Sequence, residues 1–297
     1  MSVFHSRKKQ KSHFKIVSYT IYRMIISGER IQELCDIYCG MSEDFSYNPL
    51  IRPQVSKQLS LNLIQENWNN PRIIFCYTHR LTEFINILSF LENDFILVTH
   101  NSDGNITDEY LPLLNNPKLI FWHAQNTLIL HPKLGSIPIG IANNMWPHGN
   151  KHILESTMKL NLEKVHSVYF NFSINTNYSE RSKCYESLKD TLHWQASKPF
   201  QSYLETLATY KYAICPPGNG IDCHRIWECL YLGVIPILLR STFTEKLHSV
   251  FPCILLSTWN DFDLDILTSY IAPQYTNALT FDRLKKCIHS NTDYFLE

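Results

Sequence analysis

The feature that most constrains the fold of this chain is the segment Lys211–Arg240, which reads KYAICPPGNGIDCHRIWECLYLGVIPILLR. Its two short apolar runs, Tyr212–Cys215 and Val234–Leu239, are typical of buried strands. Prolines and glycines end the first strand, and the spacing that follows predicts a helix over residues 221–232. Gly233 then supplies a helix stop. This order of strand, turn, helix and strand predicts one crossover of a parallel sheet.

The predicted helix carries polar side chains that suit a nucleoside diphosphate. A glycine-rich turn that opens onto a helix directs free backbone N–H groups toward an anion, at the positive end of the helix dipole. Arg225 lies near the helix start, where its planar guanidinium suits a phosphate. Glu228 follows one turn later, roughly 5 Å along the axis, and a carboxylate accepts hydrogen bonds from sugar hydroxyls. The alternative for this pair is an ion pair on a helix surface.

The run PPGNGIDCHRIWECLYLGVIPI resembles the donor-binding segment of exostosin-like glycosyltransferases, which have the GT-B fold. The resemblance is strongest over residues 211–240 and extends more loosely over residues 101–236. It implies an α/β fold of two Rossmann-like domains that face a cleft. By position it also implies that Arg225 holds the diphosphate, that Glu228 holds the ribose, and that the backbone of Gly218–Gly220 approaches the phosphates.

The rest of the chain continues the alternation of strands and helices. Apolar runs predict strands at Arg72–Tyr77, Phe95–Thr99, Leu119–Trp122, Val165–Phe172 and Ile254–Leu256. Helical spacing predicts helices at Leu81–Leu91, Asn150–Leu160, Phe200–Thr209 and Phe281–His289. The alternation predicts parallel sheets with helices on both faces. We expect an N-terminal, acceptor-side domain over residues 1–160 and a C-terminal, nucleotide-sugar-binding domain over residues 161–297.

A second arginine is predicted to face the same crevice as Arg225. A further helix is expected to begin at its cap Ser179, which places Arg181 in the first turn after the first strand of the second domain. We predict a phosphate contact for Arg181, and its alternative is a surface ion pair with a nearby glutamate. The complete set of predicted donor-binding residues is Arg181, Pro217, Gly218, Asn219, Gly220, His224, Arg225 and Glu228.

The predicted catalytic base comes from the first domain. Ligands of parallel sheets bind at the carboxyl ends of the strands, and Asp103 follows the strand at Phe95–Thr99. Asp103 is therefore the candidate that would deprotonate the acceptor hydroxyl, with His148 or His123 behind it. The alternative interpretation is that Asp103 only forms a turn, in the sequence Ser-Asp-Gly.

An irregular stretch over residues 124–149 separates the two sets of strands and helices. Long irregular segments in compact domains are often functional, and this one is rich in asparagine and tryptophan, which bind sugars through hydroxyl hydrogen bonds and ring stacking. Asn126, Asn143 and Trp146 are the predicted acceptor-binding residues. The alternative is a connection between domains that is packed by its aromatic side chains.

Composition narrows the class of protein further. The 297 residues are 44% hydrophobic and 13% aromatic, which excludes a disordered protein, and 27 basic against 27 acidic side chains give no attraction to nucleic acid. No stretch of 18 or more apolar residues occurs, so no membrane span is expected. The nine scattered cysteines are typical of reduced, buried thiols, and we expect a cytoplasmic location.

These observations predict a glycosyltransferase that moves a sugar from a nucleoside-diphosphate sugar to a hydroxyl of a glycan or another acceptor. No cofactor and no metal are expected, although Asp261, Asp263 and Asp265 imitate the Asp-x-Asp metal motif of the GT-A fold. Acidic residues also favour helix starts. One alternative is a non-catalytic protein that binds a nucleotide or a sugar. Another is a nucleotide-dependent oxidoreductase, but the third glycine of the dinucleotide fingerprint is absent after Gly220.

Overall fold

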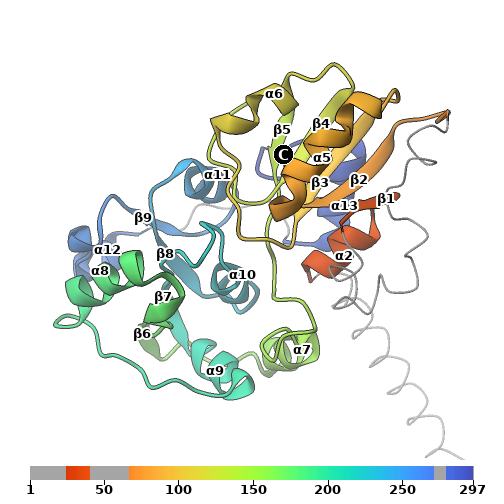
Figure 1. The fold of residues 1–297 in the computed structure, drawn as a ribbon. Coiled ribbons are helices and arrows are strands. Elements are labelled where there is room, and N and C mark those ends of the chain that lie inside the picture. The colour runs from red at the N-terminus through yellow and green to blue at the C-terminus, as the bar shows by residue number, and fades with distance from the viewer. Residues whose placement is uncertain (1–24, 41–66, 271–278, 297) are drawn as a thin grey trace, which may run out of the picture.

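The computed structural model describes residues 25–40, 67–270 and 279–296, and these residues form two parallel β-sheets with helices on both faces (Figure 1). The predicted α/β class is thereby confirmed. None of the helices in these residues combines the length and the apolar character needed to cross a lipid bilayer. In the described part of the chain, single-turn 3-10 helices link the main elements: η2 (Thr78–Arg80), η3 (Leu88–Phe90), η4 (Asp108–Tyr110), η5 (Ile174–Asn177) and η6 (Trp259–Asp261).

The first sheet has the strand order β1-β2-β3-β4-β5, and every neighbouring pair is parallel. Its strands are β1 (Ile37–Cys39), β2 (Arg72–Tyr77), β3 (Phe95–His100), β4 (Leu119–Ala124) and β5 (Leu134–Ser136). All six residues of β3 are buried, because a strand in the middle of a two-sided parallel sheet packs against helices on both faces. Strand β5 was not predicted, because its three residues, Leu-Gly-Ser, carry no periodic signal.

Alternate residues of β2 point into two different cores. Ile74 packs in one cluster with Phe84 and Leu113, which belong to α5 (Leu81–Ile87) and α6 (Leu111–Leu114). Phe75 packs in a different cluster with residues of α2 (Gly28–Glu33) and α13 (Phe281–Ser290). The first sheet is thus covered on both faces, as the continuous apolar runs predict.

The second sheet has the order β6-β7-β8-β9 and is also parallel throughout. Its strands are β6 (His166–Tyr169), β7 (Tyr210–Ile214), β8 (Ile235–Leu239) and β9 (Ile254–Leu256). Helices α8 (Tyr178–Leu188) and α12 (Leu264–Ser269) pack on one face, while α9 (Phe200–Leu207), α10 (His224–Tyr231) and α11 (Thr242–Val250) pack on the other. Helix α7 (Lys151–Leu160) lies in the chain between the two sheets.

Two predicted helix starts differ from the structure. Helix α8 begins at Tyr178 and is capped by Asn177, whose side chain accepts a hydrogen bond from Glu180 N, so Ser179 lies inside the helix and does not cap it. Helix α10 begins at His224 and not near Ile221. Asp222 stays outside this helix because its carboxylate is held by Ile139 N and by the Trp227 indole.

The C-terminal segment returns to the first sheet. The predicted division near residue 160 falls between the two sheets, but α13, which that division assigns to the second domain, packs against α2 and the first sheet (Figure 1). The Arg30 guanidinium lies 3.6 Å from the centre of the Phe281 ring. Lys246 in α11 donates to Asp293 at 2.8 Å and to Ser136 in β5 at 2.9 Å. One short polar cluster therefore ties both sheets to the C-terminal segment.

Because of two buried histidines, we expect the free energy of unfolding to decrease in acid. Burial lowers the pKa of His100 to about 4 and that of His123 to about 3, from an ordinary value of 6.5. Their stabilising contribution is fully present above pH 6.5 and is lost as the pH falls toward these lowered values, by up to about 1.4 kcal/mol per pH unit for each group. Denaturant titrations between pH 7 and pH 4 should show this loss, and His123→Phe should reduce it. An equal slope in the variant would contradict the role of His123.

Candidate functional site

A cavity of about 750 Å³ lies between the two halves of the chain, and we call it the main cavity. Its wall combines Asp103, Ile139 and residues 146–148 from the first half with loops at the carboxyl ends of β6 and β7 and with α10 from the second half. Its volume is within the range of small-molecule sites. Among the residues predicted from the sequence, its lining includes Asp103, Trp146, His148, Arg181, Gly218, Asn219, Gly220, His224, Arg225 and Glu228.

Residues 216–220 form the Pro/Gly loop, which follows β7 and is fixed by polar contacts from the start of α8. Arg181 donates through Nε to the Pro217 carbonyl and through Nη1 to the Ser173 carbonyl, both at 2.8 Å. The Asn177 side-chain amide donates to the Gly218 carbonyl at 2.8 Å. Because these donors engage the loop carbonyls, the loop is held in one conformation before any ligand arrives. Arg181 thus lies at the main cavity, as predicted, and also holds its wall.

The two loop glycines differ in the space around them. A Cβ added at Gly220 would lie 2.6 Å from the Asn126 amide nitrogen, whereas at Gly218 the nearest atom would be Arg181 Nη2 at 3.4 Å. Gly218→Ala should therefore fold with an unchanged melting temperature. If phosphate approaches this backbone, the added methyl group should lower the affinity for a nucleoside diphosphate by about tenfold. Calorimetric titration measures this effect, and wild-type affinity in the variant would show that no ligand approaches Gly218.

Arg225 lies at the end of the main cavity that is walled by α9 and α10. It donates through Nε to the Tyr203 hydroxyl at 3.2 Å and through Nη1 to the Asn171 carbonyl. Its guanidinium carbon lies 5.1 Å from the Tyr203 ring centre and 5.7 Å from the Tyr169 ring centre. Among the described residues, none accepts a hydrogen bond from Nη2. The side chain is therefore fixed on two sides, and one terminal nitrogen is left for an anion.

Glu228 is buried beside Arg225, and both share Tyr203. The Tyr203 hydroxyl donates to the Glu228 carboxylate at 2.6 Å. Burial raises the pKa of Glu228, although the Tyr203 hydrogen bond and the Arg225 charge oppose this effect. Glu228 lines the main cavity and keeps acceptor capacity, since a carboxylate accepts about four hydrogen bonds. Tyr203 and Asn171 were not predicted as site residues, because their roles depend on contacts with residues more than twenty positions away.

Asp222 is a further lining residue that the sequence did not single out. It is buried, and its two oxygens accept hydrogen bonds from Ile139 N and from the Trp227 indole, both at 2.7 Å. Burial raises its pKa to about 8, against the effect of these donors. Asp222 therefore connects the start of α10 to the first half of the chain and sets the position of the helix in the main cavity.

The candidate catalytic residues and Trp146, all from the first half of the chain, differ in whether they reach the main cavity. Asp103 is exposed at the main cavity, and its carboxylate accepts a hydrogen bond from the Asn219 side chain at 3.1 Å. Trp146 and His148 are exposed at the same cavity with stacked rings, 6.2 Å between ring centres. His123 is separated from the cavity, because it lies fully buried in β4 with its ring near Ile288 of α13.

The structure does not bring two of the predicted acceptor-binding residues into the main cavity. Asn126 is buried; its side chain donates to the carbonyls of Asp103 and Gly104 and accepts from Asp222 N. Asn143 accepts from Glu29 N and donates to the Asn101 side chain. Both amides have structural partners that are remote in sequence, so these two residues position loops, and Trp146 is the predicted acceptor-binding residue that lines the cavity.

His224 joins the two halves at the main cavity. Its Nδ1 lies 2.8 Å from the Gly140 carbonyl oxygen, and the His148 ring centre lies 6.4 Å from its own. Burial lowers the pKa of His224; the Gly140 hydrogen bond raises it and His148 lowers it again. The imidazole is therefore neutral near pH 7, and one of its nitrogens is committed to the first half of the chain.

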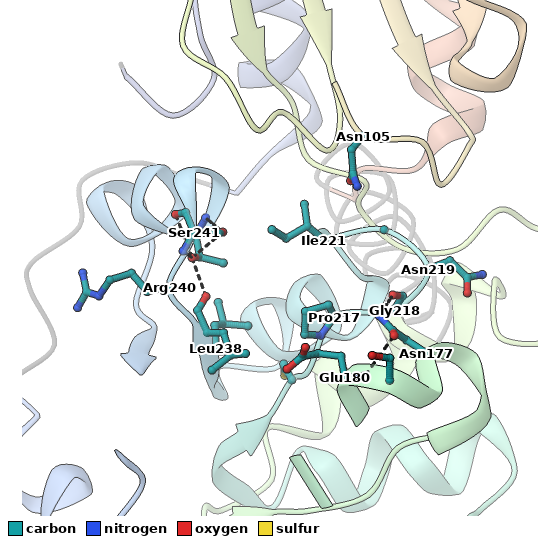
Figure 2. A pocket seen from close by; sticks show the side chains of 15 residues that line it. Asn105, Asn177, Glu180, Pro217, Gly218, Asn219, Ile221, Leu238, Arg240 and Ser241 are labelled. Atoms are coloured by element: carbon teal, nitrogen blue, oxygen red, sulfur yellow. Dashed lines mark hydrogen bonds between the residues drawn. The ribbon is translucent and has the colours of Figure 1, made fainter. Parts of the chain in front are cut away.

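A second, smaller cavity of about 340 Å³ lies on the other side of the Pro/Gly loop (Figure 2). Pro217, predicted as a donor-binding residue, lines this second cavity, together with Asn177 and Glu180 from the start of α8 and with Arg240 and Ser241 after β8. Figure 2 shows Asn105 facing the loop from the first half. The Pro/Gly loop thus lies between the two cavities and contributes to the lining of both.

The acidic motif late in the chain caps two helices. Asp261 accepts a hydrogen bond from Thr258 N at 2.6 Å, and Asp263 accepts one from Ile266 N at 2.9 Å. Within the described residues, no three His, Cys, Asp or Glu side chains gather as ligands for a metal ion. All nine cysteines lie in the described part of the chain and are free thiols.

Comparison with models of known protein families gives no match, and a search of curated proteins gives no significant relative.

Proposed function

We propose that this protein transfers a sugar from a nucleoside-diphosphate sugar to an acceptor hydroxyl, without a metal ion, in a two-domain arrangement of the GT-B type. The single observation that carries the proposal is the composition of the main cavity. Two arginines and a glycine loop at the carboxyl end of a parallel sheet line the cavity from one half of the chain, and Asp103, Trp146 and His148 line it from the other half. The same cavity thus combines anion-binding groups with groups suited to a polar acceptor.

The second half of the chain would bind the donor. The diphosphate would lie against the Gly218–Gly220 backbone, with Arg225 Nη2 and the Arg181 guanidinium as its cationic partners. Negative charge grows on the leaving diphosphate in the transition state, and donors that are already fixed stabilise that charge most effectively. The hydrogen bonds that hold Arg181 and Arg225 to backbone carbonyls supply this fixed geometry.

Calorimetric titration with UDP, GDP, CMP and NAD, each with and without Mg²⁺, tests the proposal. We expect one nucleoside diphosphate to bind with an affinity that Mg²⁺ leaves unchanged. Binding of a diphosphate without turnover of its sugar derivatives would favour a non-catalytic nucleotide-binding protein. A folded protein that binds none of the four ligands would overturn the proposal.

Glu228→Gln should separate ribose binding from phosphate binding. Glutamine still accepts the hydrogen bond from Tyr203, so the surrounding structure is kept. If Glu228 holds the ribose, losing its charged acceptor should weaken nucleoside diphosphate binding by about tenfold or more, and pyrophosphate, which has no ribose, should bind as to wild type. Parallel titrations with the two ligands measure this difference. Equal losses for both ligands would argue against a ribose contact.

A further inference from the structure

We infer that His224 is the catalytic base, and that its Nε2 takes the proton from the acceptor hydroxyl. This inference rests on the proposed function and assigns its proton transfer to a residue of α10, where the sequence predicted only a donor-binding role. His224 lines the main cavity beside Arg225 and the Pro/Gly loop. A base at this place is next to the proposed diphosphate site, where the sugar that reacts must also lie.

The hydrogen bond to Gly140 determines the tautomer of the His224 imidazole. A carbonyl oxygen is only an acceptor, so Nδ1, at 2.8 Å from Gly140 O, must carry the proton and donate it. In a neutral imidazole the other nitrogen, Nε2, then has a free lone pair. None of the described residues forms a hydrogen bond with Nε2. The ring is therefore held in the form that accepts a proton on Nε2.

The acceptor of this hydrogen bond is itself fixed. Gly140 has a φ of +68°, a conformation that favours glycine, and a Cβ added there would lie 2.3 Å from the Ile26 carbonyl oxygen. Backbone that is packed this closely leaves the Gly140 carbonyl little freedom to turn away. Because Gly140 belongs to the first half, the base is aligned only when the two halves are together.

The charged and titratable groups around His224 favour it over Asp103 as the base. Burial, together with His148 and His100 from the first half, keeps the imidazole neutral, while Asp103 supports the imidazolium that forms after proton transfer. The Asp103 carboxylate is exposed and already accepts a hydrogen bond from Asn219. Asp103 is better placed to hold the Pro/Gly loop than to move a proton.

The proposed reaction is a single displacement at the anomeric carbon of the donor. The acceptor oxygen forms a bond to the anomeric carbon of the donor while the bond from that carbon to the diphosphate oxygen breaks. The electron pair of the broken bond leaves on the diphosphate, which the arginines stabilise, and the acceptor proton moves to His224 Nε2. The imidazolium then returns this proton to solvent. Gly140 O keeps the Nδ1 proton in place throughout.

Chemical rescue of His224→Ala tests the inference without knowledge of the acceptor. Water serves as acceptor, and release of nucleoside diphosphate from UDP-glucose, UDP-N-acetylglucosamine and GDP-mannose is measured. General-base catalysis contributes about 10²–10⁴-fold, so we expect at least a hundredfold loss of turnover, and added imidazole should restore part of it. Diphosphate binding should stay within about threefold of wild type, since the Arg225 contacts remain. His193→Ala, which changes an exposed histidine, is the matched control.

The outcomes separate the inference from the proposed function. Turnover in His224→Ala within tenfold of wild type, or a loss that imidazole does not restore, overturns the assignment of the base and leaves the transferase proposal standing. A wild-type protein that binds a diphosphate and releases none from the three donors overturns both. Loss of turnover with rescue and retained binding supports both.

Discussion

Arg225→Ala is expected to lower the affinity for the nucleoside diphosphate donor by about a hundredfold, which is about 2.7 kcal/mol. The reason is that Arg225 combines a fixed guanidinium with a terminal nitrogen that no described residue engages. A charge-assisted hydrogen bond in a partly buried site is among the stronger polar contacts. Arg225→Lys should recover only part of the affinity, because an ammonium lacks the planar shape that the Tyr203 and Asn171 contacts require.

Calorimetric titration of both variants with the preferred diphosphate measures this effect. Lys189→Ala removes a cation from the protein surface, where Lys189 pairs with Glu186, and serves as the control for net charge. Arg225 also donates to Asn171 O, so the melting temperature of each variant must be recorded beside the affinity. A stable Arg225→Ala protein with wild-type affinity would remove Arg225 from the proposed diphosphate site.

Trp227→Ala is expected to cost about 3–5 kcal/mol of the free energy of unfolding. The indole is completely buried, and its ring centre lies 6.2 Å from that of Phe251 and 6.3 Å from that of Phe295. Its truncation leaves a cavity and also removes the indole N–H from the buried Asp222 carboxylate. Both losses act at the same place, where α10 packs against the C-terminal segment.

Urea titration monitored by circular dichroism measures the change in stability. Trp146→Ala is the matched control, because Trp146 is 51% exposed and its removal should change the free energy of unfolding by less than about 0.5 kcal/mol. Trp227→Phe keeps an aromatic ring but has no N–H group, so it should give an intermediate loss of about 1–3 kcal/mol from the Asp222 oxygen that loses its donor. An equal loss for Trp227→Ala and Trp146→Ala would contradict this account.

Elements whose sequence signal is local were predicted well. Strands β2 and β9 have the predicted bounds, because each is an apolar run whose ends are marked by polar or turn residues. Helix α7 begins one residue after the predicted start at Asn150, which caps it, and ends at Leu160 as predicted. In these segments the burial of side chains and the preference of the backbone favour the same conformation, so no distant contact is needed to decide it.

Features that depend on contacts between distant residues could not be predicted. The late start of α10 follows from the bond between Asp222 and Ile139 N, 83 positions apart. Asn126 was expected to bind an acceptor because amides suit sugars, yet its amide holds two loops together. The lining of the main cavity includes Arg181, His224 and Arg225 as predicted, because their positions follow from helix starts at strand ends. What each of them binds remains a prediction.

The return of the C-terminal segment to the first sheet has a consequence for synthesis on the ribosome. One apolar face of the first sheet, with Phe75 and Val98, packs with Leu284 and Ile288 of α13. The part of that face that α13 covers stays exposed while residues 137–280 are being made, although the strands beneath it are already complete. The nascent chain therefore holds an exposed apolar surface for more than a hundred residues of translation, at about 5–20 residues per second. A fragment cut after residue 160 would carry the same exposed surface permanently, so expression of the first half alone should give an aggregating protein, whereas co-expression with residues 161–297 should give a soluble complex.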